Sequence, residues 1–258
     1  MTLGFIGVGA IAAAIVEGLQ STPACGPIVL SPRNVQVAAR LATQFAEVRV
    51  APTNQAVLDA SDLVIIAVRP QVAHEVLSEL RFRPEHRVVS LIPAVTLDYL
   101  RAITAPASVV TRAVPLPSAA FRQSPTAVYP ADPSVEALFN ELGAVIELDC
   151  EEEFDAFTTA TAMMSSYFGF AGTVAGWMRR QGVSEPKAHA FVNQMLQGLT
   201  AAAEASPQKS FRELAEEHQT QGGLNQQLLQ SITAAGVFTE LERALDGVLA
   251  RLVAGRTE

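Results

Sequence analysis

The sequence is short of cysteine, lysine and net positive charge. Among its 258 residues are two cysteines, Cys25 and Cys150, and four histidines far apart along the chain. Two distant cysteines do not build a disulfide framework, so we expect free thiols and a reducing, cytoplasmic setting. The scattered histidines lack the spacing of a metal site, so no metal is predicted. The formal net charge of −8 argues against nucleic acid and anionic membrane as partners.

One segment has the length of a membrane span but not its composition. Residues 156–178 contain no charged side chain, and a stretch of that length is long enough to cross a bilayer as a helix. Threonine, serine and glycine interrupt it repeatedly, which makes insertion unfavourable. Small residues of this kind suit a helix packed closely against others. We therefore expect a helix buried within protein and no membrane contact.

The chain changes character near its middle. Hydrophobic residues make up 49% of it, enough for the cores of two ordinary domains. Up to residue 150, short β-rich runs alternate with helical patterns, which predicts a mostly parallel sheet with helices on both faces. From residue 151 only helical stretches follow, the first over residues 152–180. The predicted domains are therefore an α/β domain, 1–150, and an all-α domain, 151–258.

The first predicted strand runs directly into Gly7-Val8-Gly9-Ala10-Ile11-Ala12, a G-x-G-x-x-A pattern that opens a helix. In this setting Gly7 allows a tight turn and Gly9 lets a pyrophosphate approach the backbone. The free N–H groups at the helix start, those of Ala10 and Ile11, would face the phosphates. The pattern predicts a Rossmann domain that binds a nicotinamide dinucleotide.

The end of the second strand indicates which dinucleotide. Enzymes selective for NAD place Asp or Glu there, to accept hydrogen bonds from the ribose hydroxyls. Residues 30–34 instead read Leu-Ser-Pro-Arg-Asn, with no carboxylate. Ser31 can donate a hydrogen bond to a 2′-phosphate, and Arg33 offers it a charge-assisted fork. We predict NADP(H) as the cofactor, with NAD(H) as the alternative.

Several motifs in the first half come in the order and spacing of one known family. They lie at residues 5–12, 31–34, 53–54, 64–71, 88–91, 95–97 and 112–115. In these segments the chain resembles the pyrroline-5-carboxylate reductases. The resemblance implies reduction of a cyclic imine acid to proline by NADPH or NADH. It also implies a small-molecule substrate, and a homodimer through interlocking C-terminal helices, with dimers that assemble further.

The resemblance also implies which residues touch the cofactor. Asn54 is expected near the adenosine ribose and its phosphate. The nicotinamide side is expected to be lined by Ala67, Val68, Arg69 and Pro70. Arg69 stands where the family usually has Lys. Pro115 belongs to a turn that approaches the nicotinamide, and Leu116 follows it in place of the family's Asn.

The helical half departs from the family where the substrate is expected. The family's Ser-Gly-Ser-Gly-Pro-Ala-Tyr reads Thr-Ala-Met-Met-Ser-Ser-Tyr over residues 161–167, and its Thr-Ser-Pro-Gly-Gly-Thr-Thr reads Gln-Thr-Gln-Gly-Gly-Leu-Asn over residues 219–225. The implied substrate residues are Ser165, Tyr167, Gly222 and Gly223, the two glycines offering N–H groups as a carboxylate cradle. Thr220 keeps a hydroxyl at a carboxylate-binding position. Asn225 replaces the Thr that donates to the imine nitrogen.

These changes leave three functions to compare. An iminium substrate arrives protonated, so a weak donor such as the Asn225 amide suffices, which favours reduction of a C=N bond in a small imino acid. A β-hydroxyacid dehydrogenase-like enzyme needs a catalytic Lys on the long interdomain helix, and neither Lys187 nor Lys209 lies there. A catalytically silent nucleotide-binding dimer is the third reading. Met163 and Met164 replace small residues, and they either fill the core or reshape the substrate pocket.

Overall fold

The computed structural model describes residues 1–22 and 26–256, and Cys25 lies outside them. Cys150 is a free thiol, while the cytoplasmic location stays a prediction. Within the described residues no helix is both long and apolar enough to span a bilayer. The same residues contain no group of three His, Cys, Asp or Glu side chains able to hold a metal ion.

The chain divides by its internal packing into two compact units. One contains Met1–Thr159 together with the chain from Leu249 onward, and the other is Ala160–Val248. This boundary lies one helix later than the residue 150 expected from the sequence. The helix in question, α7 (Glu151–Ala160), packs with the sheet through Phe154, which is buried against Ala127 and Leu148.

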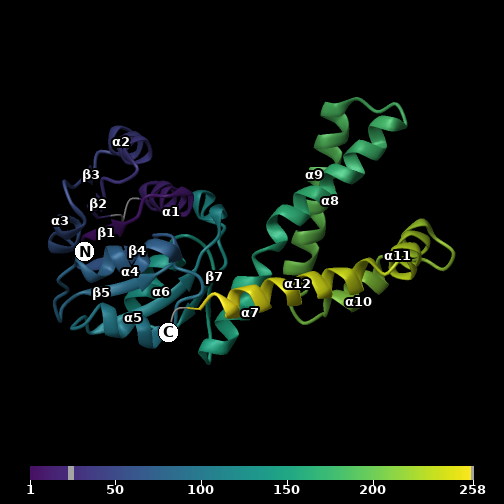
Figure 1. The fold of residues 1–258 in the computed structure, drawn as a ribbon. Helices are drawn as coiled ribbons and strands as arrows, with labels where there is room; N and C mark the ends of the chain where they lie inside the picture. Colours follow the sequence, from purple (N-terminus) through teal and green to yellow (C-terminus); the bar gives the residue numbers. More distant parts are fainter. Residues whose placement is uncertain (23–25, 257–258) are drawn as a thin grey trace. The chain divides into compact units, whose positions relative to one another are not determined.

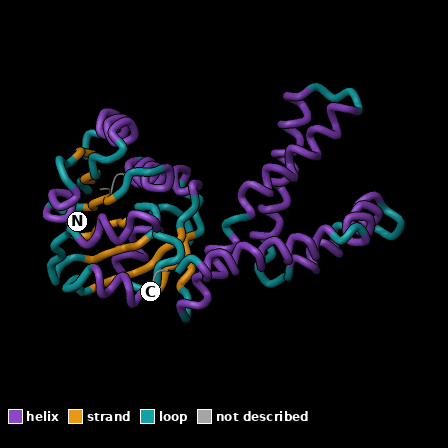
Figure 2. Tube along the Cα trace, viewed as in Figure 1, coloured by secondary structure: helices purple, strands orange, loops and turns teal. Residues whose placement is uncertain are grey.

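An eight-stranded sheet forms the centre of the first unit (Figure 2). Its strands are β1 (Leu3–Ile6), β2 (Ile28–Leu30), β3 (Val48–Val50), β4 (Leu63–Ile66), β5 (Arg87–Ser90), β6 (Val109–Val114), β7 (Thr126–Tyr129) and β8 (Val145–Glu147). They lie in the order β3-β2-β1-β4-β5-β6-β7-β8. Every neighbouring pair is parallel except β6 and β7. The mostly parallel sheet predicted from the sequence is confirmed.

Helices cover both faces of this sheet (Figure 1). They are α1 (Ala10–Gln20), α2 (Val35–Gln44), α3 (Asn54–Asp59), α4 (Pro70–Ser78), α5 (Leu97–Ile103), the 3₁₀ helix η1 (Pro117–Phe121) and α6 (Pro133–Asn140). Successive strand residues point to opposite faces, so Phe5 packs with α1, α2 and α6, while Ile6 packs with α3, α4 and α5. Two buried cores result, which is the Rossmann arrangement that the glycine pattern predicts.

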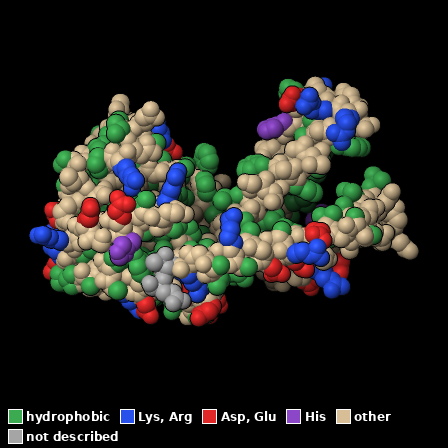
Figure 3. Space-filling model, viewed as in Figure 1, with side chains coloured by type: hydrophobic (Ala, Val, Ile, Leu, Met, Phe, Trp, Pro, Cys, Tyr) green, Lys and Arg blue, Asp and Glu red, His purple; other side chains and the backbone are tan. Residues whose placement is uncertain are grey.

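The rest of the chain is helical, as expected. After α7 come α8 (Met163–Arg180), α9 (Glu185–Glu204), α10 (Phe211–Glu217), α11 (Leu224–Ala234) and α12 (Val237–Ala254). The single helix predicted over residues 152–180 is wrong, because a turn at residues 161–162 separates α7 from α8. Within one chain α8 has no buried residue, so its burial within protein stays a prediction that requires a second subunit. Figure 3 shows hydrophobic side chains on the surface of this half.

A buried ion pair fastens α7 to the sheet. Arg112 on β6 is 1% exposed, and its Nη1 donates to Glu151 Oε1 at 2.6 Å. The guanidinium carbon lies 3.9 Å from the ring centroid of Phe154. The same Glu151 oxygen accepts a hydrogen bond from the backbone N–H of Leu97 at 2.7 Å. Burial lowers the pKa of Arg112, and the neighbouring Glu151 carboxylate opposes that shift.

Removing the charge of Glu151 is expected to destabilise this unit. Glu151→Gln keeps the size of the side chain but leaves a buried guanidinium without a counter-charge, a loss of about 3 kcal/mol. Thermal melting at fixed protein concentration measures it. The control is Glu152→Gln, an exposed neighbour, which is expected to stay within about 0.5 kcal/mol of the parent. Equal melting temperatures for both variants would contradict the role of the pair.

Candidate functional site

The predicted cofactor residues gather at one edge of the sheet. Because β1, β2, β3, β4, β5 and β6 run parallel, the loops that follow them leave from the same edge. The residues on these loops and the adjoining helix starts are Gly7, Gly9, Ala10, Ile11, Ser31, Arg33, Asn54, Ala67, Val68, Arg69, Pro70 and Pro115. Strand order reverses between β1 and β4, and ligands of open α/β sheets bind at such a switch point.

The turn between β1 and α1 has the geometry that its glycines predict. Gly7 has φ +94°, and a Cβ placed on it would lie 2.6 Å from the carbonyl oxygen of Ala67. Gly9 is the N-cap of α1, and a Cβ on it would meet nothing within 4 Å. The first bond of the helix runs from Ala13 N–H to Gly9 O. The earlier N–H groups of the 11-residue helix therefore remain for a ligand on the open side.

Two side chains from the loop after β2 hold this turn. Ser31 Oγ accepts a hydrogen bond from Gly7 N–H at 2.9 Å, and Asn34 Nδ2 donates to the carbonyl of Val8 at 3.0 Å. Ser31 is 0% exposed, which corrects the expectation that its hydroxyl meets a 2′-phosphate. A buried hydroxyl braces the turn from beneath. Asn34 is missing from the residues predicted for the site, although its motif points to this loop.

Arg33 and Asn54, both predicted for the adenosine end, line one cavity. The cavity has a volume of about 400 Å³ and is lined by Pro32, Arg33, Thr53, Asn54, Gln55, Val76, Glu79 and Leu80. Arg33 is exposed and makes no hydrogen bond or ion pair with the described part of the chain. Its guanidinium is free to form a charge-assisted fork with an anionic ligand.

The predicted nicotinamide side surrounds the end of β4. Ala67 and Val68 are half-buried, and Arg69 is the exposed N-cap of α4. Pro70 is the first residue of that helix, where its missing N–H has no consequence. Pro115 follows β6 and is buried. Apart from Arg69 these residues are apolar, and the Ala67 backbone lies directly against Gly7.

The loop between α10 and α11 lacks the free glycine N–H groups that were predicted for it. Gly222 N–H donates to Gln226 Oε1 at 2.8 Å, and Gly223 N–H donates to Thr220 O at 2.8 Å. Both glycine N–H groups are therefore occupied within the loop. The carboxylate cradle expected from them is not available in this conformation. Thr220 is exposed, so its hydroxyl stays accessible.

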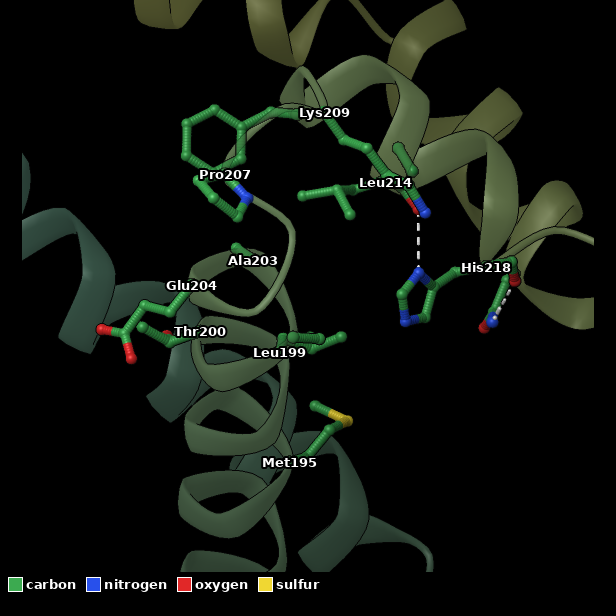
Figure 4. A pocket seen from close by; sticks show the side chains of 13 residues that line it. Met195, Leu199, Thr200, Ala203, Glu204, Pro207, Lys209, Leu214 and His218 are labelled. Atoms are coloured by element: carbon green, nitrogen blue, oxygen red, sulfur yellow. Dashed lines mark hydrogen bonds between the residues drawn. The ribbon is translucent and has the colours of Figure 1, made fainter.

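Asn225 lines a second cavity, which lies wholly within the helical unit. The cavity has a volume of about 1000 Å³, and its walls come mainly from α9, α10 and the segment between them (Figure 4). Asn225 Nδ2 donates to the main-chain oxygen of His218 at 2.8 Å, which engages one of its two amide hydrogens. His218 and Lys209 line the same cavity. Neither is among the residues predicted for the site, since nothing in the local sequence marks them.

The predicted residues on α8 are not joined to this loop. Tyr167 is 42% exposed and Ser165 is exposed as well. No hydrogen bond between either of them and residues 218–225 occurs in the described part of the chain. Met163 and Met164 are also exposed, so within this chain they do not fill a core. That leaves them free to line a pocket or to pack against a second subunit.

Each half of the chain matches a model of a known protein family. Residues 2–93 match the family model "NADP oxidoreductase coenzyme F420-dependent", and residues 151–253 match "Pyrroline-5-carboxylate reductase dimerisation". The pyrroline-5-carboxylate reductase of Pseudomonas aeruginosa is 29% identical over 264 residues, which cover 96% of this chain and 94% of that protein.

Solved structures share the whole fold. The 1-pyrroline-5-carboxylate reductase of Streptococcus pyogenes superposes with a TM-score of 0.86 at 24% identity, over 98% of each chain. The pyrroline carboxylate reductase of Plasmodium falciparum, solved with NADP bound, gives 0.85 at 16% identity, over 100% of this chain and 98% of that one. The fold and the glycine-turn edge define an NAD(P)-dependent oxidoreductase with a helical dimerisation half. The chain is similar to pyrroline-5-carboxylate reductases along nearly its whole length, and residues 151–253 match their dimerisation model. The roles of the individual site residues stay predictions.

Loss of the Ser31 hydroxyl is expected to loosen the glycine turn. Ser31→Ala leaves the half-buried Gly7 N–H without its partner, which lowers the free energy of unfolding by about 1 kcal/mol. Because the turn serves both dinucleotides, NADPH and NADH are expected to bind more weakly by a similar factor. Thermal melting and fluorescence titration measure the two effects. Ser78→Ala, at an exposed position of α4, is the control. A Ser31→Ala protein that melts and binds like the control would contradict the bracing role.

Proposed function

We propose that this chain is an NADPH-dependent reductase of a C=N bond in a small, cyclic imino acid. The observation that carries the proposal is the convergence of the glycine turn and the unpaired Arg33 at one edge of a Rossmann sheet. The relatives that match over nearly the whole chain are named pyrroline-5-carboxylate reductases, which supports this substrate class.

The residues of the first unit fit the parts of a nicotinamide dinucleotide. The start of α1 and the open side of Gly9 suit the pyrophosphate. Arg33 and Asn54 suit the phosphorylated ribose, with NADH as the weaker alternative. Residues 67–70, apolar apart from Arg69, suit the nicotinamide. When bound, the reduced nicotinamide supplies the hydride, so the protein has to bind, orient and supply a hydrogen bond.

The lack of a strong acid at Asn225 favours an imine over a carbonyl. Asn225 Nδ2 donates to His218 O, and Oδ1 of the same amide is left to accept a hydrogen bond from the N–H of an iminium. An iminium already carries its proton, so the protein need not supply one. A carbonyl needs a firmer acid to stabilise the developing alkoxide. Thr220 remains the proposed hydroxyl contact for a substrate carboxylate.

One observation keeps the carbonyl-reducing alternative in view. Lys209 lines the same cavity as Asn225, although it lies outside the long helix where a β-hydroxyacid dehydrogenase carries its lysine. Its Nζ is 2.7 Å from Glu217, a partly exposed ion pair that engages the ammonium. The third reading, a catalytically silent nucleotide-binding dimer, predicts cofactor binding without turnover of either substrate class.

We also propose a homodimer through the C-terminal helices. Residues 151–253 match a dimerisation model, and among the described residues of α8–α12 only Ala188 and Val192 are buried. Phe211 and Leu224 are each 84% exposed. So much apolar surface on one set of helices requires a protein partner. Light scattering at micromolar concentration tests this, and a monomer would contradict it.

Cofactor preference tests the assignment of the adenosine end. Arg33→Gln removes the proposed partner of the 2′-phosphate, so NADPH affinity is expected to fall about 10- to 100-fold while NADH affinity changes less than about 3-fold. Arg49→Gln, an exposed arginine outside the cavity, is the control. Fluorescence titration of the three proteins with both dinucleotides gives the ratios. A parent protein that prefers NADH would refute the assignment to NADP(H).

Substrate class is tested by steady-state oxidation of NADPH with cyclic imines and 2-oxo acids. We expect turnover of imines, and a fall in kcat of about 10- to 100-fold in Asn225→Ala because a hydrogen-bond partner of the reacting nitrogen is lost. Asn225→Thr restores the family's residue and is expected to raise turnover of pyrroline-5-carboxylate. Asn193→Ala, an exposed asparagine outside the cavity, is the control. Turnover of 2-oxo acids alone would favour the dehydrogenase-like alternative.

A further inference from the structure

The cavity proposed for the adenosine end is lined by an acidic as well as a basic side chain. Arg33 enters it from the loop after β2, and Glu79 enters it from the end of α4. Both side chains are exposed, and neither has a hydrogen-bond or ion-pair partner for its charge within residues 1–22 and 26–256. The two charges therefore act on whatever occupies the cavity. A carboxylate here is unexpected, because the strand end that usually carries the NAD-selecting acid lacks one.

Glu79 is held in place by the backbone around it. It is the C-cap of α4, with its N–H bonded to the carbonyl of Leu77. Two residues later, Arg81 N–H donates to Gln55 Oε1 at 2.9 Å, and Gln55 Nε2 donates to Arg81 O at 3.4 Å. Gln55 itself belongs to α3 and lines the cavity. These bonds join the start of α3 to the segment just after α4, which holds the Glu79 backbone beside the cavity.

The carboxylate has opposite effects on the two dinucleotides. A 2′-phosphate carries nearly two negative charges at neutral pH, and Glu79 repels them. The carbonyl end of α4 adds a negative dipole of the same sign. Without the phosphate, the ribose 2′-hydroxyl is a donor that a carboxylate accepts. Arg33 favours the phosphorylated form, and Glu79 opposes it.

We propose that Glu79 is a specificity-determining residue that limits the preference of this protein for NADPH over NADH. The proposal rests on the proposed function, because it takes the cavity between Arg33 and Glu79 as the binding site of the adenosine ribose. It assigns the selectivity of the site to the balance of two opposite charges, one on the loop after β2 and one at the end of α4. Arg33 alone does not set the preference for NADPH over NADH.

Affinity measurements on Glu79→Gln test the proposal. NADPH is expected to bind roughly 3- to 10-fold more tightly than to the parent, and the gain is expected to shrink as salt is added, because an exposed charge is screened. NADH is expected to bind equally or more weakly, so the NADPH/NADH ratio rises. Glu75→Gln is the matched control, since Glu75 is an exposed acid on the same helix that does not line the cavity.

The outcomes separate this proposal from the proposed function. An unchanged or lower NADPH/NADH ratio in Glu79→Gln, with a lowered ratio in Arg33→Gln, overturns the role of Glu79 and leaves the cofactor site standing. A rise of the same size in Glu75→Gln also overturns it, because a general charge effect then explains the gain. Failure of the parent protein to bind either dinucleotide overturns both. A rise in the NADPH/NADH ratio that occurs only in Glu79→Gln supports the proposal that Glu79 and Arg33 together set the selectivity.

Discussion

Two hydrogen bonds between neighbouring loops position the sheet edge at which the predicted cofactor residues gather. Gly7 N–H donates to Ser31 Oγ, and Asn34 Nδ2 donates to Val8 O, so the loop after β2 fixes the turn after β1. The turn sets the direction of α1 and of its free N–H groups. The same loop carries Arg33 into the adenosine cavity. One local clamp therefore fixes the start of α1 and the loop that carries Arg33 relative to each other, the two places proposed to bind the pyrophosphate and the 2′-phosphate.

Much of the fold was predictable because its signals are local. The alternation of apolar strands with helices predicts a parallel sheet, and Gly7 at φ +94° is a position that the glycine pattern itself demands. Arg33 and Asn54 come from separate loops, and the sequence order of a Rossmann domain brings both to one edge. The helix α6 (Pro133–Asn140) was not predicted from the sequence, although Asp132 caps it and Pro133 opens it.

What could not be predicted depends on contacts between distant residues. Whether the Ser31 hydroxyl faces a ligand or the turn beneath it is decided by packing across 24 residues of sequence. The N–H groups of Gly222 and Gly223 are engaged by Gln226 and Thr220, which a motif comparison does not reveal. Glu79 reaches the adenosine cavity through the placement of α4 against α3. The turn at residues 161–162 interrupts a segment whose composition reads as one continuous helix.

The central claim is that the protein binds NADPH across the glycine turn, with the start of α1 at the pyrophosphate. Hydrogen–deuterium exchange with and without saturating NADPH tests it at the level of single segments. The account predicts slower exchange on binding in the peptide that contains Ala10 and Ile11, and in the peptide that contains Arg33. Saturable NADPH binding that leaves both peptides unchanged, with protection elsewhere in the chain, would contradict it.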